Sequence, residues 1–119
     1  MAIRTLGVHT WINHTGSIWE NAKDIAHRRL RPDATSPKID TLPAGQPLTI
    51  LCYSLGTTEE FINPLGIRNT SNAWDFVVTS DQDSGGYVAD VYVNTDGDIA
   101  QQLGEQGRCN ALKQRLANS

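Results

Sequence analysis

The chain lacks long apolar runs and an excess of basic residues, and each absence argues against one class of protein. No stretch approaches the roughly 20 apolar residues that a membrane-spanning helix needs. The N-terminus also lacks the charged region, apolar core and cleavage site of a signal peptide. With 10 Lys and Arg against 13 Asp and Glu, the net charge is −3 at pH 7, which disfavours binding to nucleic acid by phosphate neutralisation. We therefore expect synthesis in the cytoplasm, no export by a signal peptide, no membrane partner and no nucleic-acid partner.

Cysteine is scarce, and its two copies leave one question open. Two cysteines cannot make a zinc site by themselves. Cys52 lies in an apolar run, and Cys109 follows the glycine-containing stretch Gly104–Arg108. A disulfide between Cys52 and Cys109 would close a long loop and contribute about 4 kcal/mol in the chain-entropy model. Cytosolic synthesis opposes this bond and a later oxidising environment would allow it, so both states remain open.

The length and the absence of repeats limit the domain organisation. A chain of 119 residues has room for one domain with a modest core and an extra arm, but not for two independent cores. No internal repeat and no low-complexity tract is visible. We expect an N-terminal arm over residues 1–27, a central domain over 28–95 and a C-terminal tail over 96–119.

Two runs of alternating residues predict a β-hairpin. Trp74–Val78 and Tyr87–Val93 flank the turn-forming stretch Asp81–Gly86, and this order is typical of two strands around a connection. Upstream, the turn residues Pro43–Gly45 lead into the apolar strand Leu48–Cys52. Short strands, tight turns and a double glycine are what a small antiparallel barrel requires. We therefore predict an all-β fold.

The N-terminal arm is harder to interpret. Thr5–Trp11 has strand-like content, and Asn13–Gly16 predicts a turn. Ser17–Glu20 fits a capping box, which predicts a short helix over Ile18–Ala26. Extended structure is the alternative, because apolar and polar residues also alternate over Ile25–Arg31.

The remaining segments are expected to be mostly irregular. Arg31–Ile39 is polar with two prolines and predicts a loop. Thr57–Thr70 predicts a second long loop or a short distorted strand. Asn94–Asp98 predicts a turn, and Ile99–Leu116 a frayed helix. The basic run His27–Arg31 has no interleaved aromatic residues and is expected to be a solvated edge.

Several sequence pieces resemble one known family. Leu30-Arg31 precedes a polar loop and then IDTLPAGQPLTILC at Ile39–Cys52. SNAWDFV at Ser71–Val77 is followed by GGYVADVYVNT at Gly85–Thr95. These pieces resemble the bacterial SH3-like domain, whose members commonly carry G-T-L-P-A-G-T-x-V-T-V-x-C and later S-x-x-W-x-x-V with G-G-Y-V-S-D-x-Y-V-x-T. This form is familiar from secreted actinobacterial proteins and phage proteins.

The resemblance covers about residues 28–95 and implies both a fold and a use. It implies a small SH3-like antiparallel barrel that acts as a binding module for cell-wall peptides or protein partners. Arg31–Ala34 departs from the family's usual R-S/A-G-P, so the loop that often borders the ligand groove is not carried over. Fold alone does not determine function.

The polar residues do not predict a catalytic or metal site. Acidic residues cluster in sequence, but each is expected beside a turn or on the polar side of a strand. Asp81-Gln82-Asp83 and Asp96-Gly97-Asp98 resemble fragments of calcium loops without the terminal glutamate or the full ligand series. His9, His14 and His27 have no spacing typical of a metal site or of a nucleophile pair. We expect no catalytic residues, no metal and no cofactor. The acidic residues are Asp75, Asp81, Asp83, Asp90, Asp96 and Asp98.

The aromatic residues are the better binding candidates. Trp74, Tyr87 and Tyr92 could line a groove that stacks on a peptide or a sugar. The alternative places Trp74 and Tyr87 in the core, and for Trp74 we favour it. Trp11 and Trp19 lie outside the family resemblance, and two tryptophans in a short arm should pack on the central domain or on another subunit.

These features together predict a non-enzymatic protein of an assembly. The leading hypothesis is an accessory component of a phage particle, either a capsid decoration or a tail-associated protein, which docks on other proteins in an oligomeric virion. The alternative is a free-standing module that binds bacterial cell wall through peptidoglycan.

Overall fold

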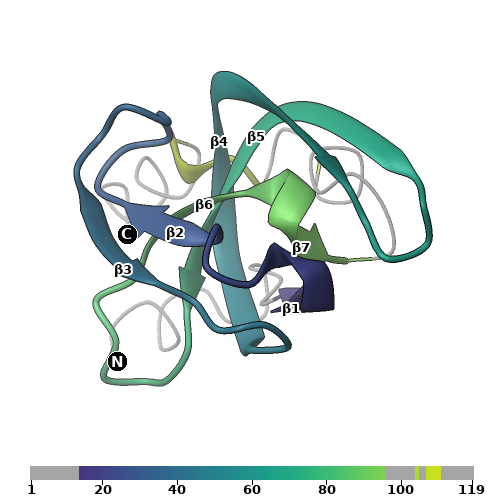
Figure 1. The fold of residues 1–119 in the computed structure, drawn as a ribbon. Coiled ribbons are helices and arrows are strands. Elements are labelled where there is room, and N and C mark those ends of the chain that lie inside the picture. The colour runs from purple at the N-terminus through teal and green to yellow at the C-terminus, as the bar shows by residue number, and fades with distance from the viewer. Residues whose placement is uncertain (1–13, 96–103, 105–106, 111–119) are drawn as a thin grey trace.

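The computed structural model describes residues 14–95, 104 and 107–110, and these form one antiparallel sheet. The sheet has seven strands in the order β3-β2-β6-β5-β4-β1-β7, with the long strands β4 and β5 running through the molecule (Figure 1). In chain order the elements are β1 His14–Ile18, the 3-10 helix η1 Glu20–Ala22, β2 His27–Arg29, β3 Lys38–Thr41, β4 Pro47–Ile62, β5 Arg68–Val78, β6 Gly86–Ala89, the 3-10 helix η2 Asp90–Tyr92 and β7 Val93–Asn94.

The predicted all-β antiparallel class is confirmed, but the sheet is not closed into a barrel. β3 and β7 are its two edges, and within the described residues they do not pair with each other. β7 contributes only the pairs Ser17 with Asn94 and Ile18 with Val93. In the described part of the chain, the β7 edge of the sheet is thus only two residues long.

β4 and β5 form a hairpin much longer than the sequence predicted. Their pairing continues from Thr49–Val78 to Ile62–Arg68, with register shifts between Ile50 and Cys52 and between Leu55 and Glu59. Bulges of this kind bend a strand and increase its twist. The segment Thr57–Thr70, expected as a loop or a short distorted strand, is therefore the far half of this hairpin and its turn.

The predicted hairpin around the double glycine is confirmed in its first half. β5 pairs antiparallel with β6 from Trp74–Ala89 to Val77–Gly86. The predicted second strand, Tyr87–Val93, does not continue unbroken, because the 3-10 helix η2 interrupts it. η2 redirects the chain so that β7 pairs with β1.

The predicted turn at Asn13–Gly16 and the predicted helix over Ile18–Ala26 are wrong. His14–Ser17 pairs with β4 as strand β1, and η1 is a single 3-10 turn without a side-chain cap. The extended alternative holds from His27 onward as β2. Ile18, Ala22 and Ala26 are buried in the core, so packing against the sheet outweighs the capping signature.

Some predictions fall outside the described residues. They are the strand Thr5–Trp11, most of the helix Ile99–Leu116, and the side chains His9, Trp11, Asp96 and Asp98.

The main core is apolar and draws on almost every strand. Its buried members come from β1, β4, β5, β6 and β7, with contributions from η1 and the turns beside it. Trp19, Phe61 and Tyr92 pack against it from its margin. The buried residues are Ile18, Ala22, Ala26, Leu42, Leu48, Ile50, Tyr53, Ala73, Val77, Val88 and Val93.

A disulfide joins Cys52 of β4 to Cys109, with 4.9 Å between their Cα atoms. Both sulfurs are buried beside Phe76 and Tyr87. The same segment is held by a parallel bridge between Tyr53 and Arg108. Residues 107–110 are thereby fastened to the middle of the sheet.

The basic run is a solvated edge only in part: Leu30 and Arg31 are exposed, but Arg28 is buried. Its Nε donates to Asp40 Oδ1 at 2.8 Å, and its Nη1 forms an ion pair with Asp83. Asp83 also accepts from the Thr79 and Gly85 backbone N–H groups at 2.8 Å and 3.0 Å. Burial by itself raises the pKa of Asp83, but the hydrogen bonds from Gly85, Arg28 and Thr79 hold it well below its ordinary value. This network ties β2, β3 and the β5–β6 connection together.

Candidate functional site

Trp74 belongs to the core, which confirms the interpretation that we favour for it from the sequence. Its side chain is 2% exposed, and its Nε1 donates to the Thr57 carbonyl at 2.9 Å. It clusters with Ala89 and Val91. A ring enclosed in this way offers no face on which a ligand could stack.

Tyr87 and Tyr92 lie around the same buried cluster as Trp74 and are half-buried. Tyr87 meets Phe76 edge to face with 5.2 Å between ring centroids, and Tyr92 meets Phe61 in the same way at 5.2 Å. Much of their aromatic surface is therefore used in packing.

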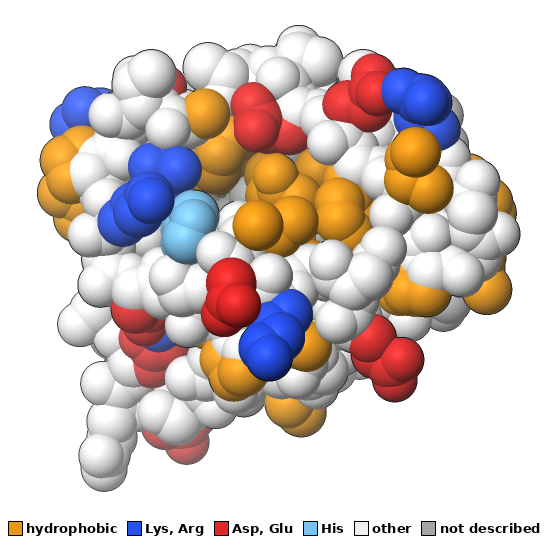
Figure 2. Space-filling view, viewed as in Figure 1, with side chains coloured by type: hydrophobic (Ala, Val, Ile, Leu, Met, Phe, Trp, Pro, Cys, Tyr) orange, Lys and Arg blue, Asp and Glu red, His pale blue; other side chains and the backbone are white. Residues whose placement is uncertain are grey.

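A small hollow of about 230 Å³ lies beside Tyr92. Figure 2 shows hydrophobic side chains gathered at the centre of this face, with a histidine and basic side chains beside them over β2. Burial lowers the pKa of His27, and Lys38 and Arg29 lower it further. Burial raises the pKa of Tyr92 and Glu59 adds to the rise. The described residues that line it are Ile25, His27, Arg29, Ala34, Glu59, Trp74 and Tyr92.

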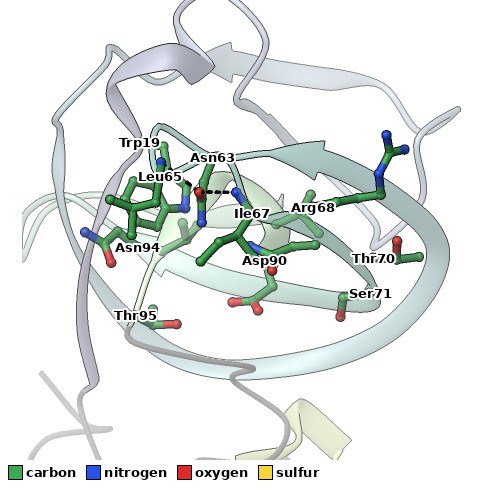
Figure 3. A pocket seen from close by; sticks show the side chains of 13 residues that line it. Trp19, Asn63, Leu65, Ile67, Arg68, Thr70, Ser71, Asp90, Asn94 and Thr95 are labelled. Carbon is green, nitrogen blue, oxygen red and sulfur yellow. Dashed lines mark hydrogen bonds between the residues drawn. The ribbon is translucent and has the colours of Figure 1, made fainter.

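A larger cavity of about 540 Å³ lies between the β4–β5 turn and the segment η2–β7, and we call it the turn cavity (Figure 3). Trp19 is the one aromatic side chain among the described residues that line it. Figure 3 shows Trp19, Leu65 and Asn63 together at one end, and Thr70 and Ser71 on the opposite side. The described residues that line it are Trp19, Asn63, Leu65, Ile67, Arg68, Asn69, Thr70, Ser71, Asp90, Val91, Val93, Asn94 and Thr95.

Asn63 builds the turn that borders this cavity. Its Oδ1 accepts from the backbone N–H groups of Leu65 at 2.9 Å and Ile67 at 3.1 Å. Its own backbone N–H donates to the Ile67 carbonyl at 3.0 Å, and its carbonyl accepts from Gly66 at 2.9 Å. Gly66 has a φ of 81°, a conformation that glycine adopts at little cost. These hydrogen bonds thus hold the turn in one conformation and the Asn63 amide in one orientation.

The β4–β5 turn carries exposed aliphatic side chains. Leu65 is 73% exposed, Ile67 53% and Ile62 47%, and we call these three residues the hairpin rim. Two of them, Leu65 and Ile67, also line the turn cavity. Adjacent exposed aliphatic side chains next to a cavity are typical of an interaction surface.

The opposite wall of the turn cavity comes from η2 and β7. Asp90 is buried in this wall. Asp75 lies elsewhere, on β5, and is fully enclosed. The expectation that both carboxylates lie beside turns or on the polar side of a strand is wrong for Asp75, which is enclosed within β5. Asp90 does lie at a turn, the start of η2, but it is buried. Asp83 is bound by Arg28, Thr79 and Gly85 rather than held open for a cation.

Within residues 14–95, 104 and 107–110, no group of three or more His, Cys, Asp or Glu side chains could hold a metal ion. None of the helices in the described part of the chain combines the length and the apolarity needed to cross a bilayer.

Sequence reasoning placed Trp19 in a docking role but missed the residues that accompany it. For the segment that holds Asn63, Leu65 and Ile67, the sequence predicts a long loop or a short distorted strand and no function. The stretch Asn63-Pro64-Leu65-Gly66 does carry a turn signal between two apolar residues. That signal indicates a hairpin, but it does not indicate that the turn reaches Trp19.

Comparisons with known proteins found no match: no family model, no curated protein and no solved structure is similar to this chain at a significant level.

Proposed function

We propose that this protein is a non-enzymatic docking module and an accessory component of a phage particle, as a capsid decoration or a tail-associated protein. The hairpin rim supports a docking role most directly. Three aliphatic side chains exposed by 47% to 73% beside a cavity of about 540 Å³ are costly to leave in water and favourable to cover with a partner.

We also propose that the open sheet is a variant of the SH3-like barrel. The pieces that resemble the family fall on the strands: Ile39–Cys52 covers most of β3 and the first part of β4, Ser71–Val77 lies in β5, and Gly85–Thr95 spans β6 to β7. The phage setting rests on this resemblance, because related forms occur in phage proteins.

The test is the presence of this protein on particles purified from the phage whose genome encodes it. Quantitative mass spectrometry should find a fixed copy number per particle. Leu65→Ser with Ile67→Ser should lower that copy number several-fold, because the rim would lose its apolar contacts. Leu30→Ser, which alters another exposed leucine, is the matched control and should leave the copy number per particle unchanged. Absence of the protein from purified particles would refute the phage proposal.

A peptidoglycan-binding module is the second candidate, and the small hollow beside Tyr92 favours it. Arg29, Glu59 and Tyr92 line that hollow, so both signs of charge stand beside an aromatic ring. Short cell-wall peptides carry ammonium and carboxylate groups that suit such a site. A pull-down on purified peptidoglycan tests this candidate. The unmodified chain should be retained, and Glu59→Gln or Tyr92→Ala should abolish the retention while the variants remain folded. That result would support peptidoglycan binding over docking on a particle.

A further inference from the structure

We propose that the turn cavity binds an extended, uncharged segment of a partner protein, which inserts an aliphatic side chain at the Trp19 end and receives a hydrogen bond from Asn63. This inference rests on the proposed docking function and names the chemistry of its partner.

The amide of Asn63 is a fixed donor at the cavity wall. Asn63 is 6% exposed, and its Oδ1 is occupied by the N–H groups of Leu65 and Ile67. Those two bonds identify the other end of the amide as the NH₂ group. Within the described residues this NH₂ donates no hydrogen bond, and it is not among the fully enclosed unpaired atoms. A preorganised donor that borders a cavity is suited to a carbonyl of a ligand.

The same end of the cavity supplies an apolar surface. Trp19, Leu65 and Ile67 line it, and Figure 3 shows Leu65 beside Trp19. The exposed fractions of Leu65 and Ile67, 73% and 53%, leave most of their surface for a partner to cover. These aliphatic side chains favour a ligand that also presents an aliphatic side chain. A sugar would instead need an open aromatic face on which to stack.

The position of β7 favours an extended segment. β7 is the last strand in the sheet and pairs with β1 alone among the described strands. Val93 and Asn94 of β7 line the cavity, but no residue of β1 does. The cavity therefore lies beside a sheet edge along which an extended segment can lie, with Arg68–Ser71 of β5 on the other wall. The Val93 N–H is not open to that segment, because it donates to the Asp90 carbonyl.

The charge of the lining favours an uncharged segment. Among the described residues that line the cavity, two are charged, Arg68 and Asp90, and they have opposite signs. Arg68 is an exposed residue that forms an ion pair with Glu60, and Asp90 is buried. Figure 3 shows both charged residues away from the Trp19 end, so a charged side chain inserted at that end would lose its hydration without a charged partner beside it.

NMR titration of the ¹⁵N-labelled full chain tests the inference. The probes are two capped peptides, Ac-Ser-Thr-Leu-Thr-Ser-NH₂ and Ac-Ser-Thr-Asp-Thr-Ser-NH₂, and the sugar N-acetylglucosamine. Each is added up to about 10 mM, because a ligand that makes few contacts is expected to bind with millimolar affinity. The leucine peptide should change the chemical shifts of the Asn63 side-chain NH₂, the Trp19 indole N–H and the Asn94 amide. The aspartate peptide should bind at least several-fold more weakly. No shift with the leucine peptide, equal binding of both peptides, or binding of the sugar alone would overturn the inference.

Asn63→Asp is the decisive variant. An aspartate keeps an oxygen that accepts from Leu65 and Ile67, so the turn is preserved, but it replaces the NH₂ donor by an acceptor. Affinity for the leucine peptide should fall at least 5- to 10-fold, the size expected for one lost hydrogen bond. Ile67→Ser provides a second variant at an exposed position and should also weaken binding. Leu30→Ser should bind as the unmodified chain does, and unchanged affinity in Asn63→Asp would refute the role of the amide.

The particle assay separates this inference from the proposed function. Peptide binding by a chain that is absent from phage particles would uphold the cavity and refute the phage role. Normal incorporation of Asn63→Asp into particles, after its peptide binding is lost, would uphold the phage role and refute the cavity as its docking site.

Discussion

The carbonyl oxygen of Pro32 lies directly over Gly56, so close that a Cβ added to this glycine would stand 1.6 Å from that oxygen. The backbone N–H of Thr57 donates to the same carbonyl at 3.3 Å, and the Thr57 hydroxyl accepts from the Ala34 backbone N–H at 3.0 Å. The loop between β2 and β3 is thereby held against the bend of β4, and the absence of a side chain at Gly56 makes this contact possible.

Gly56→Ala should therefore destabilise the protein by about 3 kcal/mol, since the added methyl must displace backbone rather than a flexible side chain. Urea unfolding measures this cost. Gly66→Ala is the matched control, because it has nothing within 4 Å and only a positive φ of 81°. That control should cost about 1 kcal/mol. Equal costs for the two variants would show that the Pro32 contact is not tight.

Asp83→Asn should remove a contribution to stability that depends on pH. The pKa of Asp83 in the folded protein lies well below its ordinary value of 3.8, so the ionised form stabilises the fold above about pH 3.8. This stability is lost as the pH falls below 3.8 towards the folded pKa. Urea unfolding at pH 7 should show a loss of about 2 kcal/mol in the variant, and a smaller difference from the unmodified chain at about pH 2.5. Glu20→Gln, at an exposed position, is the control and should change the free energy of unfolding at pH 7 by no more than about 0.5 kcal/mol.

Cys52→Ala with Cys109→Ala should destabilise the protein by about 4 kcal/mol in the chain-entropy model, because the bond spans a separation of 57 residues. Denaturant unfolding with and without a thiol reductant measures the effect. The reductant should destabilise the unmodified chain and leave the double variant unchanged. An intact mass that corresponds to two free thiols, in protein purified under oxidising conditions, would contradict the disulfide.

Trp74→Phe should destabilise the protein by about 2 kcal/mol, because it leaves the Thr57 carbonyl without its donor and the core underfilled. Tyr92→Phe, which removes a hydroxyl from a half-buried ring, should change stability by no more than about 0.5 kcal/mol. Thermal or urea unfolding compares the two. Unchanged stability in Trp74→Phe would mean that this ring is not part of the core.

Local patterns were sufficient for part of the fold. The turn at Pro43–Gly45 is confirmed, with Gln46 N–H donating to the Pro43 carbonyl at 3.1 Å and a φ of 77° at Gly45. The strand around Trp74 and the burial of its ring are confirmed as well. In each case neighbouring residues carry the whole signal: side-chain alternation for a strand, and proline and glycine for a turn.

The missed elements are those in which distant partners decide the conformation. His14–Ile18 has little apolar alternation and becomes a strand because β4 and β7 pair with its backbone. The far half of the β4–β5 hairpin is largely exposed, so no buried face marks it in the sequence. The capping pattern at Ser17–Glu20 favours a helix locally, but burial of Ile18 and Ala22 against the sheet prevails.

The sequence by itself determined that this chain is an antiparallel β protein with Trp74 in its core, because alternation and turn residues act over a few neighbouring positions. The tertiary structure alone decided that the sheet stays open, that Arg28 is buried between two carboxylates, and that Trp19, Asn63 and Asn94 line one cavity. Those outcomes depend on strand order and on how far the β4–β5 hairpin bends, and these are set by contacts between segments that lie tens of residues apart.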